Sequence, residues 1–203
     1  MAITSIKTGS SFTNLTKYND FLAGNTAFQP TAYESIATVT VGSGGSSSIT
    51  FSSIPSTYQH LQIRWLGRSA RTGSTNDALK MSFNSATTNY YGGHFLYGTG
   101  AAAGAFADST SSTMYGGYVS TADSIASSFA AGIIDILDYA NTNKNKTVRL
   151  ISGIENNGTG GYLNFSSSLW MQTTAVNSIT LTANSATNLQ QYSKFGLFGI
   201  KGA

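Results

Sequence analysis

The sequence predicts an all-β protein, specifically an antiparallel β-sandwich of the jelly-roll kind that follows an N-terminal arm. Three observations predict this class. Short segments alternate between apolar and polar residues, as Leu61, Ile63 and Trp65 do in one of them. Clusters of Gly, Ser, Thr and Asn separate these segments and are typical of turns. About ten such segments at short spacing, with little helical pattern, are typical of a sandwich.

The first 32 residues differ from the rest, and we expect them to form an extended or short helical arm. Their apolar residues recur at helix-like spacing, with Ser11 as a possible N-cap and Gly24 as a stop. Such an arm can pack on its own domain or insert into a neighbour. The arm residues expected to bind a partner are Phe12, Leu15, Tyr18, Phe21, Leu22 and Phe28.

Residues 33–203 are expected to form the β-sandwich domain. A break at Ile54–Pro55 requires a turn, because proline cannot continue a central strand. Residues 98–112 are rich in small side chains and are expected to be a loop, either mobile or in contact with a partner. Residues 122–127 are expected to form one short helix. The expected strands are 34–41, 47–51, 58–68, 78–83, 92–98, 113–119, 130–139, 146–155, 162–172, 178–183 and 194–200.

The composition indicates a polar surface that carries few charges. Of the 203 residues 40% are hydrophobic and only 9% are charged, against roughly 25% in an ordinary soluble protein. The net charge is +3, and the Lys and Arg residues are scattered rather than gathered in a stripe. Because a nucleic-acid partner requires such a stripe, we expect none. This surface suits a protein that works inside an assembly, in salty water or among sugars.

The sequence also excludes several kinds of site and segment. It has no cysteine, so it can hold no disulfide or zinc–thiolate site. Its N-terminus lacks an apolar stretch of signal-peptide length, and no segment is long enough to span a bilayer. We therefore expect synthesis in a cytoplasm and no membrane partner.

No pattern of an active site, metal site or cofactor site is present. His60 and His94 are the only histidines, and neither belongs to a known catalytic or metal-binding spacing. Asp135, Asp138 and Glu155 are the one acidic cluster to test for a glycosidase. Alternation along the strand places Asp135 and Asp138 on opposite faces, which argues against a dyad. We expect a non-enzyme with no metal and no cofactor.

Tyrosines near the expected strand ends are candidates for contact with partners. A tyrosine offers rigid apolar area together with a hydroxyl, which suits both protein interfaces and sugar stacking. The alternative is that these rings border the core of the sandwich. The candidates that we take as partner-binding residues are Tyr90, Tyr91 and Tyr97.

Several strand-and-turn motifs resemble a β-sandwich module of structural proteins, of decoration or fibre type, from marine tailed bacteriophages. The motif "TFSSIP" is followed by "YQHLQIRWLGR", and the chain ends in "SKFGLFGIKG". The segments that carry the resemblance are 50–55, 58–68, 79–100, 133–153 and 193–202. These motifs identify the module and specify no chemistry, so the resemblance transfers no functional residues.

The resemblance implies a virion protein made in the host cytoplasm. The first hypothesis is a capsid decoration (cement) protein that stabilises the shell through subunit contacts. Its partners would be the major capsid protein or tail proteins, and it would act as a homo-oligomer, for example a trimer. The alternative is a tail fibre, spike or baseplate component that binds host surface glycans.

Overall fold

The computed structural model describes residues 32–88, 90–158 and 160–202. These residues form twelve β-strands in two antiparallel sheets, and the described part of the chain contains no helix. The prediction of an all-β antiparallel sandwich is therefore confirmed. The arm of residues 1–32, with its six predicted contact residues, lies almost entirely outside the described residues.

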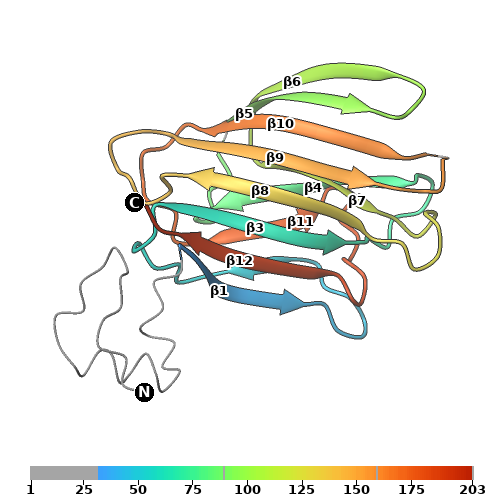
Figure 1. Ribbon diagram of the computed structural model, residues 1–203, viewed down its shortest axis with the longest axis horizontal. Helices are drawn as coiled ribbons and strands as arrows, with labels where there is room; N and C mark the ends of the chain where they lie inside the picture. The colour runs from blue at the N-terminus through green and yellow to red at the C-terminus, as the bar shows by residue number, and fades with distance from the viewer. Residues whose placement is uncertain (1–31, 89, 159, 203) are drawn as a thin grey trace, which may run out of the picture. The chain divides into compact units, whose positions relative to one another are not determined.

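The large sheet has eight strands and presents one broad face to the viewer in Figure 1, from β6 at the top to β1 at the bottom. Every pair of neighbours in it is antiparallel. Its spatial order is β1 (Tyr33–Thr40), β12 (Lys194–Ile200), β3 (His60–Gly67), β8 (Ala130–Leu137), β9 (Lys146–Ile154), β10 (Tyr162–Trp170), β5 (Tyr91–Gly98) and β6 (Ala103–Ser111).

The small sheet has four strands and covers one face of the large sheet, with β4, β7 and β11 visible behind it in Figure 1. Strand β7 lies against β9 and β10 of the large sheet. The order of the small sheet is β2 (Ile49–Phe51), β11 (Ile179–Ala183), β4 (Asn76–Phe83) and β7 (Met114–Ser120).

The hydrophobic core lies between the two sheets and follows from the period-two pattern. On β3, Leu61, Ile63 and Trp65 point into the core, as their alternation predicts. The large sheet contributes Ile134 of β8 to this core, and the small sheet contributes Leu181 of β11; both side chains are fully buried. Burying such side chains is the main favourable term of the fold.

Two local predictions were wrong. Residues 98–112 were expected to be a loop, whereas Ala103–Ser111 form strand β6, which pairs with β5. The backbone ladder provides the hydrogen bonds of this strand, so small side chains do not prevent it from forming. Residues 122–127 form turns instead of a helix, and Ser127 has a positive φ of 62°.

Candidate functional site

The outer face of the large sheet, which points away from the small sheet, carries an apolar row that crosses four strands. The register of the sheet aligns Ile133 of β8 with Ile151 of β9, then with Phe165 of β10 and Leu96 of β5. The exposed fractions of the last three side chains are 49%, 51% and 58%. Leu163 is exposed by 60% on the same face, one row away. Exposed apolar side chains that are contiguous, rather than scattered singly, mark an interaction surface.

A shallow hollow of about 580 Å³ lies on this face above β12, β3, β8 and β9. Its rim includes the apolar side chains of Leu66, Leu163 and Phe198. Gly153 and Gly196 also line it, and a glycine on the outer face contributes no side chain to fill the space. The lining also includes Arg64 and Lys194, so the hollow combines an apolar rim with two cations.

A polar row runs parallel to the apolar row on the same face, two residues away along each strand. Its members in register are Gln62, Asp135, Arg149, Ser167 and His94. Gln62 Nε2 donates a hydrogen bond of 2.7 Å to Asp135 Oδ1. The side-chain oxygen Oε1 of Gln62 accepts a hydrogen bond from Arg64 Nε at 2.9 Å. Asp135 is therefore engaged by an amide and is not paired with a second carboxylate.

The other suspected acids take structural positions. Asp138 follows the end of β8 and forms an ion pair with Lys144 Nζ. The hydrogen bond from Lys144, together with its positive charge, lowers the pKa of Asp138 against the opposing effect of burial. Glu155 accepts a hydrogen bond from the Gly158 backbone N–H at 3.1 Å.

The histidine beside these acids also takes a structural position. His60 Nδ1 accepts a hydrogen bond of 3.0 Å from the Asp138 backbone N–H, which occupies the nitrogen that faces the acid. Within residues 32–202, apart from the two undescribed positions, no three or more His, Asp or Glu side chains lie together as metal ligands would.

The three predicted contact tyrosines differ in their positions. Tyr90 is exposed by 40% just before β5. Tyr91 is fully buried, with its ring stacked on Trp170 at 6.3 Å between centroids, so it belongs to the core and not to a surface. Tyr97 is half-buried and stacks on Tyr162 at 5.3 Å.

Sequence reasoning missed the outer face, although a signal for it exists. The neighbouring residues Ile133 and Ile134 are both apolar, and so are Leu150 and Ile151. In a strand, two successive residues point to opposite faces, so such pairs indicate a strand that is apolar on both faces. Strands of this kind are found where both faces of a sheet are covered.

Comparison of the chain with known proteins finds no matching family model, no matching curated protein and no matching solved structure. A search of the described residues for membrane-spanning helices finds none with the required length and apolar character.

Proposed function

We propose that this chain is a structural protein of a tailed-phage virion, acting as a capsid decoration protein. In this role the outer face of the large sheet docks on other virion subunits, such as the major capsid protein. The exposed apolar row of Ile133, Ile151, Phe165 and Leu96 is the observation that carries the proposal. Covering these side chains would remove apolar surface from water, which favours association.

The architecture and the arm support the same proposal. At most of its connections the chain crosses from a strand of one sheet to a strand of the other. Such crossings are compatible with a sandwich of the jelly-roll kind. We propose that residues 1–32 reach a neighbouring subunit, where Phe12, Leu15 and Phe21 would be buried. Many weak contacts repeated by symmetry would then hold the shell together.

The experiment measures binding of the full chain to purified phage shells that lack it. Phe165→Lys places a charge in the apolar row and should abolish binding, because an unpaired charge is costly to bury. Ser167→Lys is the matched control, since Ser167 is also exposed, on the same face and strand, in the polar row. Ser167→Lys should bind like the wild type.

Two results would contradict the proposal. Equal binding of Phe165→Lys and the wild type would exclude the apolar row as the contact. A copy number of only a few per purified virion, rather than one that follows the symmetry of the shell, would exclude decoration of the capsid and favour a tail component.

A further inference from the structure

A second hollow, of about 560 Å³, opens at one end of the sandwich where four loops meet. The loops connect β1 to β2, β3 to β4, β7 to β8 and β11 to β12. The hollow shares no residue with the hollow on the outer face. The side chains that give it its chemistry are Tyr192, Phe129, Asn188, Gln190, Gln191 and Ser127.

The hollow offers no free charge to a ligand. Arg68 is the one charged residue that lines it, and it is buried. Its Nη1 donates to the backbone oxygens of Ile125 and Ser128, both at 2.8 Å. Its Nη2 donates to those of Ala122 at 3.3 Å and Ser124 at 3.2 Å. These four bonds use the four N–H groups of the two Nη atoms, so the guanidinium serves the loop and not an anion.

The remaining chemistry suits a ligand that is polar but uncharged. The Tyr192 side chain is exposed by 69%, which leaves a large part of its ring available for stacking. The amides of Gln190 and Gln191 provide both hydrogen-bond donors and acceptors. Asn188 Nδ2 donates to the Gly44 backbone oxygen at 3.4 Å, which leaves one N–H and the amide oxygen of Asn188 for a ligand. An aromatic ring beside several amides matches a sugar ring, which has an apolar face and hydroxyl groups at its edge.

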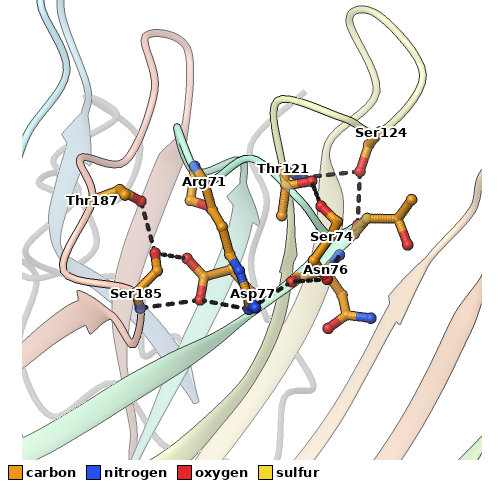
Figure 2. Close-up of polar contacts among 10 residues, drawn as sticks. Arg71, Ser74, Asn76, Asp77, Thr121, Ser124, Ser185 and Thr187 are labelled. Carbon is orange, nitrogen blue, oxygen red and sulfur yellow. Dashed lines mark hydrogen bonds and ion pairs between the residues drawn. The ribbon is translucent and has the colours of Figure 1, made fainter.

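The loops around the hollow are held in place by partly buried polar contacts, which Figure 2 shows. Asp77, fully buried on β4, accepts hydrogen bonds from the backbone N–H and the hydroxyl of Ser185. The Ser185 and Thr187 hydroxyls lie 2.8 Å apart. Ser124 Oγ donates to the Thr75 backbone oxygen at 2.8 Å. The β11–β12 loop is therefore held to strand β4, and the β7–β8 loop is held to the β3–β4 loop, so a ligand would lose little conformational entropy in ordering them.

The backbone of the hollow is strained at its most exposed aromatic residue. Tyr192 has a φ of 72°, a left-handed conformation that bulky side chains rarely adopt. Ser127, which also lines the hollow, has a φ of 62°. The Tyr192 backbone N–H donates to the Val41 oxygen at 3.0 Å, which holds the turn. Strain that persists where glycine would be easier to accommodate points to a role for the side chain itself.

We propose that this hollow binds a neutral carbohydrate. The ring of Tyr192 would stack on the apolar face of one sugar, and the amides of Asn188, Gln190 and Gln191 would bond its hydroxyls. The inference does not rest on the proposed assembly role, because it uses a different surface. A sugar site of this kind is compatible with a position on the head or on the tail of a virion.

The experiment screens the full chain on an array of neutral oligosaccharides (glucans, mannans, galactans) and of uronic-acid and sulfated oligosaccharides. Affinity for the best neutral sugar is then measured by calorimetry. Tyr192→Gly removes the ring and relieves the strained φ, so it should weaken binding about tenfold or more while the melting temperature stays equal or rises. Tyr192→Phe keeps the ring and should bind within about threefold of the wild type.

Tyr33→Ala is the matched control, because Tyr33 is an exposed tyrosine outside the hollow, and it should leave the affinity unchanged. The inference is overturned if no neutral sugar binds, if only anionic sugars bind, or if Tyr192→Gly binds as well as the wild type. Its failure is distinct from failure of the assembly role, since Phe165→Lys should leave sugar affinity unchanged and Tyr192→Gly should leave shell binding unchanged.

Discussion

Gly132 shows how a single residue allows a large ring to fit in the core. It lies on β8 directly opposite Trp65 of β3. A Cβ at Gly132 would come within 2.4 Å of the buried indole, which is far inside van der Waals contact. The indole occupies the space that a side chain on the neighbouring strand would fill. Such pairing of a very small residue with a very large one is a feature of tightly packed cores.

We predict that Gly132→Ala lowers the free energy of unfolding by about 1–3 kcal/mol, because the ring must move in a packed core. Gly153→Ala on β9 is the control, since the nearest atom to its Cβ lies at 3.7 Å. That substitution should be neutral or stabilise the fold by up to about 1 kcal/mol. Urea unfolding followed by tryptophan fluorescence measures both. Equal effects at the two positions would show that the contact with Trp65 is unimportant.

Buried charges could not be predicted residue by residue. The fully buried Lys146 donates to the backbone oxygens of Asn141, Lys144 and Thr173 at 2.6–2.9 Å. Arg68 is satisfied in the same manner by carbonyl groups more than fifty residues away. A sequence pattern places a Lys or Arg on a polar face by default. The carbonyl groups that satisfy these two cations become neighbours only after the loops have folded.

Strand β6 is the least protected element of the large sheet. It lies at the edge, so only β5 pairs with it, and most of its residues are exposed. Strand β9, in contrast, pairs with β8 and β10 and contacts β7 of the small sheet. An element with one paired edge and little burial opens at lower free energy than a central one.

We therefore predict that amides of residues 103–111 exchange with deuterium faster than amides of residues 146–154. The reason is that β6 can separate from β5 without exposing the core, whereas β9 cannot leave without opening the whole sheet. Hydrogen exchange of the full chain, read by mass spectrometry, tests this at a low protein concentration. Comparable protection of the two segments would contradict the prediction.

Most elements, though not all, follow from the sequence. The alternation in 58–68 and 162–172 predicts β3 and β10, because each of these strands buries one face. The segment that forms β6 lacks such alternation, since the small sheet covers little of it and small residues occupy both faces. Its strand arises from pairing with β5, which is a tertiary effect.

At the scale of the whole molecule, the sandwich could be predicted but its interaction surfaces could not. The apolar row unites residues from four strands, and the order of those strands is not written in any local pattern. The hollow at Tyr192 likewise unites four loops that are distant in the chain. The composition favours a protein that acts in an assembly or among sugars. The residues that would contact a subunit or a sugar can be identified only from the topology.

The two sheets share one core, so we expect the sandwich to unfold cooperatively. Ile134→Ala in the large sheet and Leu181→Ala in the small sheet each remove a fully buried side chain and should each cost about 2–5 kcal/mol. Both tryptophans, Trp65 and Trp170, lie on strands of the large sheet. If the sandwich unfolds as one unit, Leu181→Ala must shift the tryptophan fluorescence transition as far as the circular dichroism transition.

Ser167→Ala, on the exposed outer face, should leave both transitions in place. A fluorescence midpoint that stays unchanged in Leu181→Ala, while circular dichroism shows an earlier step, would contradict a shared core. In that case the small sheet would unfold independently, which would require the large sheet to be stable with both of its faces in water. The apolar residues on both faces of β8 and β9 make that state unfavourable, so we expect a single transition.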